Sequence, residues 1–146
     1  MSSTITFKRL FEPLQIKNVR FRNRLVKTPQ DMGYANTDGS VSQRNLDFYE
    51  ALARGGVGAI IVEHAYVDFP LGSRDLMISV ADDKVIPSLT KLAEVIHKHG
   101  CPVFQQINHL GPQYKPTASG LQAVAPSALS EDYMQKTFGV TYNLRA

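Results

Sequence analysis

The sequence predicts an α/β fold in which helices cover a parallel sheet. Two segments with helical apolar spacing, near 40–54 and 85–99, alternate with short apolar runs that are typical of strands. One of these runs, VGAIIV at 57–62, is apolar at nearly every position, as in a strand buried on both faces. These observations together indicate successive βα units rather than an antiparallel sandwich.

The composition indicates one ordinary domain. The chain has 146 residues, of which 43% are hydrophobic, so it has enough apolar material for a packed core. Its single cysteine, Cys101, excludes an internal disulfide and is expected to be a small buried thiol. The start, MSSTITFKRLFEPL, has no apolar signal core, and no apolar run approaches the ~18 residues of a membrane span. We therefore expect a cytoplasmic protein with no membrane partner.

Positive charge is concentrated near the N-terminus, where seven of the 16 Lys and Arg residues fall within the first 27 positions. A basic arm of this kind can bind nucleic acid. Here, however, the charges alternate with apolar residues such as Val19, Phe21 and Leu25, as on the solvated face of a hairpin. We expect the solvated face and no nucleic-acid partner.

The first elements are expected to be short strands. Leu14–Lys17 and Val19–Arg22 alternate with period two around Asn18, which predicts a β-hairpin. Leu25–Thr28 should form a short strand that Pro29 stops. The glycines and polar residues of 30–39 then predict a loop.

The first helix is expected to begin with a capping box formed by Ser40 and Gln43 and to end at Gly55-Gly56. The strand at 57–62 follows it and is expected to end at Glu63. The residues expected on the helix's buried face are Leu46, Tyr49, Leu52 and Ala53.

After a loop at 69–81, a second helix is predicted from Val85 to His99, with Pro87 in its first turn and Gly100 beyond its end. Pro102–Ile107 should be the next strand. The residues from Gly111 onward show no clear period and are expected to form one long loop, with a short strand at 121–125.

Polar residues stand at the carboxyl end of every predicted strand of the parallel sheet. They are Thr28-Pro29-Gln30, Glu63-His64 and the stretch from Gln105 to His109. In α/β folds, ligands bind at the carboxyl ends of the strands, so this coincidence predicts a ligand site. Alternation along the third strand should place Gln106 and Asn108 on one face, with Gln105 and Ile107 on the other.

Five stretches resemble the Old Yellow Enzyme family of FMN-dependent oxidoreductases, closest to its enoate and 2,4-dienoyl-CoA reductases. They are LFEPLQIKNVRFRNRLVKTPQ (10–30), FYEALARGGVGAIIVE (48–63), HKHG (97–100), FQQINHLG (104–111) and VAPSAL (124–129). The resemblance implies an FMN-binding TIM (β/α)₈ barrel. A complete barrel needs about 250 residues, so residues 1–146 are expected to be the N-terminal part of one such domain, with about three βα units after a hairpin.

The resemblance also implies roles for individual residues. Thr28, Pro29 and Gln30 match family positions that touch the flavin ring, and Gln106 matches a glutamine that pairs with its pyrimidine edge. A primary amide suits that edge because it offers a donor and an acceptor together. The alternative is that these are ordinary strand ends satisfied by neighbouring backbone.

Three further residues are weaker candidates. His64 stands where relatives have a small residue beside the flavin, so it either contacts the ring or turns aside at the barrel mouth. Tyr34 and His109 are candidate substrate contacts, with a solvent-exposed loop tyrosine as the alternative for Tyr34. Pro112 replaces an arginine of the family motif near His109. No metal site is expected, because His97 and His99 do not share a helix face.

The resemblance implies NAD(P)H as the reductant and an activated C=C bond of an unsaturated carbonyl or acyl-CoA as the substrate. An iron–sulfur cluster is expected only in a longer parent chain. The catalytic residues of the family lie beyond the matched stretches, so none is assigned here. The alternative expectation is a non-catalytic fragment, or a split-barrel subunit that needs a complementary C-terminal chain or a homo-oligomer to cover its open sheet edge.

Overall fold

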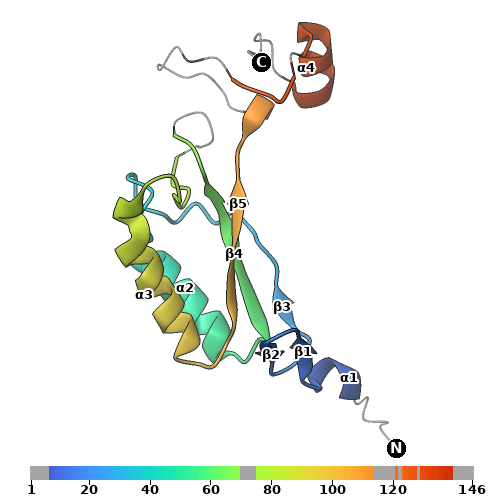
Figure 1. Cartoon of the computed structure of the whole chain (residues 1–146), viewed down its shortest axis with the longest axis vertical. Coiled ribbons are helices and arrows are strands. Elements are labelled where there is room, and N and C mark those ends of the chain that lie inside the picture. Colours follow the sequence, from blue (N-terminus) through green and yellow to red (C-terminus); the bar gives the residue numbers. More distant parts are fainter. Residues whose placement is uncertain (1–6, 70–74, 114–120, 122, 128, 140–146) are drawn as a thin grey trace, which may run out of the picture.

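The computed structural model describes residues 7–69, 75–113, 121, 123–127 and 129–139. Figure 1 shows helices packed on one face of a small sheet, with a hairpin near the N-terminus and a further helix near the other end. The elements are α1 (Lys8–Phe11), β1 (Leu14–Ile16), β2 (Val19–Phe21), β3 (Val26–Lys27), α2 (Gln43–Arg54), β4 (Ala59–Tyr66), η1 (Asp83–Val85), α3 (Ile86–His97), β5 (Val103–Asn108), η2 (Gly111–Gln113) and α4 (Glu131–Phe138).

The predicted hairpin is confirmed as the antiparallel pair β1–β2, in which Gln15 lies opposite Arg20. Lys17 makes the turn with a left-handed φ of 51°. On β2 the side chain of Arg20 is exposed whereas that of Phe21 is buried, as the alternation of charged and apolar residues predicts. The hairpin therefore covers the amino end of the sheet with its one apolar face.

The predicted parallel sheet is also confirmed, with strand order β3-β4-β5 and both pairs parallel. Lys27 lies opposite Ile60, and Ile60 lies opposite Val103, which fixes the relative height of the three strands. Of the expected strand at 25–28, only Val26 and Lys27 pair.

The core lies between the sheet and the helices α2 and α3, which cover the same face (Figure 1). Ile60 and Val62 of β4 are fully or almost fully buried there. Burial of a side chain of this size stabilises the fold by about 1.5–3 kcal/mol. The helix residues in this cluster are Leu46, Tyr49, Ala53, Leu92 and Ile96.

The predicted capping box at Ser40 and Gln43 is wrong. The N-cap of α2 is Ser42, whose side chain accepts from Asn45 N, while Asn45 Oδ1 accepts from Ser42 N at 3.1 Å. Ser40 forms its hydrogen bonds in the loop before the helix, where its amide and its hydroxyl both donate to Asp38 Oδ1. The predicted end of the helix at Gly55-Gly56 is confirmed.

The strand expected to end at Glu63 continues to Tyr66. The extension is paired, because Tyr66 N donates to Ile78 O and Val80 N donates to Tyr66 O. The register between β4 and β5 shifts between Val62 and Ala65, which marks an irregularity at Glu63 and His64. These two residues therefore lie within a strand rather than after one.

The C-terminal region is more structured than predicted. Ser130 caps α4 by accepting from Tyr133 N, and Gly139 ends the helix with a left-handed φ of 67°. The short strand expected at 121–125 is reduced to a single bridge at Val124, with position 122 outside the described residues. The predicted helix at 85–99 and strand at 102–107 are confirmed as α3 and β5 within two residues at each end.

Candidate functional site

The three predicted polar stretches follow from neighbouring parallel strands, whose register is matched at Lys27, Ile60 and Val103. Three residues after the matched set Lys27, Ile60 and Val103 come Gln30, Glu63 and Gln106. We call the residues Thr28, Pro29, Gln30, Glu63, His64 and Gln106 the strand-end site. Polar residues toward the carboxyl end of neighbouring parallel strands are the arrangement from which α/β folds build ligand sites.

The two glutamines of β5 face opposite sides. Gln105 lines an apolar cavity together with Leu89 and Leu92 of α3, so it points toward the helices. Gln106 is exposed and follows Phe104, whose ring stacks on Phe21 of the hairpin, so both are on the other face. The sequence-predicted separation of these side chains is therefore what the structure shows.

Several side chains of the site are open to a ligand. Thr28, Gln30 and Gln106 are exposed, and their side chains make no hydrogen bond to another described residue. Pro29 between them is half-buried and has no amide hydrogen to offer. The site thus presents amide and hydroxyl groups that a polar ring edge could satisfy.

Glu63 is the centre of the site's hydrogen bonding. Its side chain is fully buried, and its carboxyl oxygens accept from Met32 N at 2.9 Å, from Asn45 Nδ2 at 2.9 Å and from the Tyr49 hydroxyl at 3.4 Å. Its own amide donates to the Tyr49 oxygen at 2.9 Å. Burial raises the pKa of Glu63, and the hydrogen bond from Met32 N opposes that shift.

Sequence reasoning named Glu63 only as a strand end and missed its partners Met32, Asn45 and Tyr49. The signal was present, because an acidic residue directly follows the apolar run VGAIIV. A carboxyl in such a position is buried at a cost unless donors surround it. Burial also raises the pKa of Tyr49, the first cause of its shift, with the nearby Glu63 charge adding to it.

His64 lies on β4 with its Nε2 atom 3.8 Å from Asp31 Oδ2. That nitrogen is buried and has no hydrogen-bond partner among the described residues. Burial lowers the pKa of His64, which favours the neutral imidazole. The imidazole and the Asp31 carboxyl therefore form a half-buried pair beside the strand-end site.

Tyr34 is held against α2. The Arg44 guanidinium carbon lies 3.8 Å from the centroid of its ring, and the Phe48 ring meets it edge-on at 6.0 Å. The ring is half-buried rather than fully exposed, unlike the expected alternative of a solvent-exposed loop tyrosine. The packing of Tyr34 is consequently explained by α2 without a ligand.

His109 follows β5 and is oriented at both ring nitrogens. Its Nδ1 atom accepts from Gly111 N at 2.9 Å, and its Nε2 atom lies 3.6 Å from Asp68 Oδ2. Since Nδ1 is the acceptor, the proton of the neutral ring is on Nε2, where it faces the carboxylate. His109 is thus positioned by the residues beyond β4 and β5.

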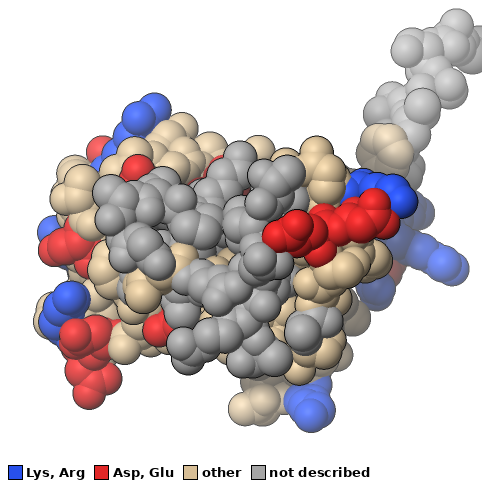
Figure 2. All heavy atoms as spheres, turned by 90° about the horizontal axis from the view of Figure 1, so that it is seen from above, with Lys and Arg blue, Asp and Glu red and all other residues tan. Residues whose placement is uncertain are grey.

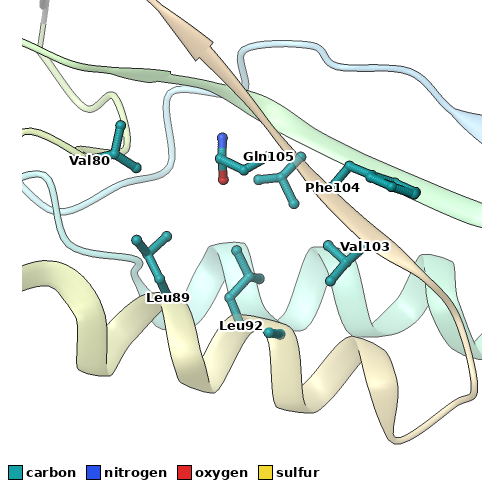
Figure 3. A pocket seen from close by; sticks show the side chains of 8 residues that line it. Val80, Leu89, Leu92, Val103, Phe104 and Gln105 are labelled. Carbon is teal, nitrogen blue, oxygen red and sulfur yellow. The ribbon is translucent and has the colours of Figure 1, made fainter.

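The sheet also borders a hollow that is separate from the strand-end site. A cavity of about 240 Å³ lies between α3 and β5, and its lining is almost wholly apolar. Figure 3 shows Leu89 and Leu92 of α3 pointing toward Val103 and Gln105 of β5. This cavity opens on the helix-covered side of the sheet, away from the face that carries Gln106.

Charges of both signs surround the end of the molecule seen in Figure 2, where Lys, Arg, Asp and Glu side chains are interspersed around the rim.

Within the described residues, no group of three or more His, Cys, Asp or Glu side chains is arranged to hold a metal ion. None of the described helices combines the length and apolar character that crossing a bilayer requires.

Known proteins resemble this chain in sequence over most of its length. A family model described as "NADH:flavin oxidoreductase / NADH oxidase family" matches residues 9–144. An NADH oxidase of Thermoanaerobacter brockii is 46% identical over 123 residues, which are 83% of this chain and 19% of that protein. An NADPH dehydrogenase of Clostridium acetobutylicum is 33% identical over 129 residues, 88% of this chain and 38% of its own. The chain therefore spans less than half the length of these relatives.

Solved structures give the same picture of the fold. An Old Yellow Enzyme from a Pichia species superposes with a TM-score of 0.80 at 24% identity, covering 94% of this chain and 37% of that one. An Old Yellow Enzyme homologue from Zymomonas mobilis gives a TM-score of 0.74 at 25% identity, with coverage of 82% and 33%. The described chain corresponds to the N-terminal portion of these barrels, as its three parallel strands and N-terminal hairpin predict.

Proposed function

The chain belongs to the NADH:flavin oxidoreductase / NADH oxidase family, and from this premise we propose that it forms the first part of an FMN-binding barrel of the ene-reductase type. The observation that carries the proposal is the parallel pairing of β3, β4 and β5, which carries Gln30, Glu63 and Gln106 toward the same end of the sheet. In this proposal residues 1–146 are the N-terminal part of one FMN-binding TIM-barrel domain.

The residues present fit a flavin ring. Thr28, Gln30 and Gln106 have exposed side chains without described hydrogen-bond partners. A flavin's pyrimidine edge alternates carbonyl and N–H groups, and a glutamine amide can donate and accept in the same plane. We assign Gln106 to that edge, and Thr28, Pro29 and Gln30 to the bed of the ring. His64, whose buried Nε2 makes no hydrogen bond to a described residue, is assigned to its border.

The chemistry that bound FMN supplies would be hydride transfer from NADH or NADPH to an activated C=C bond of an enone, enoate or dienoyl-CoA. The part of this chain is to bind and orient. Gln106 would fix the ring edge, and the apolar wall from Phe21 and Phe104 closes the amino end of the same face. Tyr34 and His109, at the outer rim, are the candidates for contact with substrate.

The test is titration of the purified 146-residue chain with FMN, followed by flavin fluorescence and visible absorbance. We expect a bound-flavin spectrum that bleaches on addition of NADPH or NADH. Gln106→Leu should weaken binding about tenfold, as expected for one lost pair of hydrogen bonds, about 1–2 kcal/mol. The same change at Gln15, in the hairpin, should leave the affinity unchanged. Equal affinities for the two variants would contradict the assignment of Gln106.

A second candidate function is that of a non-catalytic piece or a subunit completed by a complementary chain. Apolar side chains favour it: Val26 of β3 is 44% exposed, and Phe104 and Ile107 of β5 are 42% and 67% exposed. The apolar cavity between α3 and β5 adds apolar surface at the β5 edge of the described sheet (Figure 3). Exposed apolar strands of this kind pair with other chains.

Size in solution separates the two candidates. Under the first, the chain binds FMN by itself or as a homo-oligomer of defined mass. Under the second, the chain alone gives no flavin spectrum, and a C-terminal barrel fragment of a relative restores one when it is mixed with this chain. Light scattering coupled to absorbance detection reports both mass and bound flavin in one experiment.

A further inference from the structure

We propose that Glu63 is a positioning residue, a buried latch that holds the segment 28–33 against β4 so that Thr28, Pro29 and Gln30 meet the flavin at a fixed height. The inference rests on the proposed FMN site. It assigns a role to a residue that touches no ligand itself and acts through the backbone of its neighbours.

The first ground is the burial of a carboxyl among apolar residues. Glu63 is 0% exposed, and it directly follows the core residue Val62. None of its described hydrogen-bond partners is a cation, since they are a backbone amide, an asparagine and a tyrosine. A buried carboxyl costs several kcal/mol unless donors surround it, and an apolar residue would fill the space at no such cost. The reason for a carboxyl at this buried position is therefore the set of hydrogen bonds that it accepts from its neighbours.

The second ground is the division of labour between its two oxygens. Oε1 accepts from Asn45 Nδ2, and Oε2 accepts from Met32 N, both at 2.9 Å. Asn45 is itself fixed, because its Oδ1 atom accepts from the amide and hydroxyl of Ser42 at the start of α2. One carboxyl thus ties the segment after β3 to the first turn of α2.

The third ground is the position of Met32 in the chain. β3 ends at Lys27, opposite Ile60, and further along the chain Ala35 N donates to Leu76 O. The Met32–Glu63 bond lies between these points, two residues after Gln30. It is a direct attachment of the flavin-bed segment to β4.

The fourth ground is that Glu63 also reaches β5. The Gln105 side chain donates through Nε2 to the Glu63 carbonyl and to the Gln106 carbonyl. Gln106 is the residue assigned to the pyrimidine edge, so its backbone is fixed relative to Glu63. The backbone of β4 at Glu63 is therefore attached to both flanks of the strand-end site, to one of them through the Glu63 carboxyl and to the other through its carbonyl.

The test compares Glu63→Gln with wild type in the full 146-residue chain. A glutamine keeps the shape but replaces one oxygen by an NH₂ group, which then faces the donor of either Met32 or Asn45. Amide hydrogen exchange of Met32 measures the latch directly and needs no flavin. We expect it to accelerate about tenfold, as for one lost hydrogen bond, with a rise in the Kd for FMN of about tenfold and a shifted flavin absorbance band.

Two controls separate positioning from general loss of stability. Glu50→Gln removes a carboxyl at the other end of α2, where it pairs with Lys98 and His99. Leu92→Ala lowers stability through the core without touching the latch. Both should leave the Met32 exchange rate, relative to global unfolding, and the flavin band as in wild type.

The outcomes are distinct. Unchanged Met32 exchange in Glu63→Gln, or faster exchange with an unchanged Kd for FMN, would overturn the latch. A wild-type chain that binds no FMN would instead contradict the proposed function, whereas the exchange result would still report on the Met32–Glu63 bond. If Glu63→Gln does not fold, the test is made on the wild-type chain. Bound FMN must then slow amide hydrogen exchange in residues 28–33 further, and an exchange rate that FMN leaves unchanged refutes the proposal.

Discussion

Phe21 and Phe104 stack with their ring centroids 6.2 Å apart and an angle of 11° between the ring planes. The contact joins the N-terminal hairpin to β5, strands that are more than eighty positions apart in the sequence. It closes the amino end of the sheet on the face that carries Gln106. The hairpin therefore contributes to the stability of the sheet although it shares no hydrogen-bonded ladder with it.

Removal of this contact should cost stability unequally. Phe21 is 7% exposed and Phe104 is 42% exposed, so Phe21→Ala should lower the free energy of unfolding by about 3 kcal/mol and Phe104→Ala by about half as much. The double variant should show a coupling of about 0.5–1.5 kcal/mol in urea unfolding. Strict additivity would mean that the hairpin is held elsewhere, for instance by the Arg22 bond to the His99 carbonyl.

Gly58 should not tolerate a side chain. A Cβ atom at this position would lie 2.2 Å from the carbonyl oxygen of Asn23 and 2.6 Å from its Oδ1 atom. Asn23 cannot retreat easily, because its Nδ2 donates to Gly56 O and its Oδ1 accepts from Leu25 N. Gly58→Ala should therefore cost about 3 kcal/mol. Gly55→Ala, with φ of −66°, is the matched control and should cost little.

The ion pairs at the end of α2 should make stability depend on pH. The Lys98 side chain, followed by His99, lowers the pKa of Glu50. A lowered carboxyl pKa contributes stability above the unfolded value of about 4.3, and this contribution is lost as the pH falls through the folded value. Glu50→Gln should be less stable than wild type near neutral pH and equal to it in acid.

The experiment is urea unfolding of both proteins at several pH values. Added salt should narrow the difference near neutral pH, since Glu50 is partly exposed and salt screens such pairs. A difference that persists unchanged below the folded pKa would show that the Glu50 side chain acts through packing and not through charge.

His64 should titrate below the ordinary histidine range, because burial lowers its pKa. Asp31→Asn should lower that pKa further, since it removes a carboxylate whose oxygen lies 3.8 Å from Nε2. The measurement is NMR titration of the imidazole resonances. Asp68→Asn is the control, because Asp68 pairs with His109 and should leave His64 unchanged. A rise in the pKa of His64 in Asp31→Asn would contradict the pairing.

Much of the fold follows from local patterns in the sequence. The period-two alternation of 14–22 and the spacing of Leu89, Leu92 and Ile96 predict the hairpin and α3, because each reflects one buried face. The helix α4 was missed because its eight residues include only three apolar ones, too few to show a clear helical period. The only signals of this helix in the sequence are its caps, which are Ser130 followed by two acidic residues at the start and Gly139 at the end.

The sequence predicts where the polar strand ends lie, but it does not predict the hydrogen bonds that connect them to the rest of the chain. The polar strand ends predicted one end of the sheet as the candidate site, and the parallel pairing of β3, β4 and β5 carries them toward the same end. The partners of Glu63 could not be read from spacing, since Met32, Asn45 and Tyr49 reach it from a loop and a helix whose approach depends on packing. For the same reason the cap of α2 was misplaced, because Asn45 serves Ser42 and Glu63 together.

The members of the core cluster all lie in one continuous stretch of the chain, from Ala35 to Cys101. That whole stretch leaves the ribosome before β5 does, so the apolar centre can begin to assemble while the strand that carries Gln106 is still inside the exit tunnel. We expect chains arrested shortly after Cys101 has emerged to resist proteolysis between 35 and 101, whereas chains arrested before α3 should be digested. Gln106 would then be the last residue of the strand-end site to join, on a support that has already begun to fold.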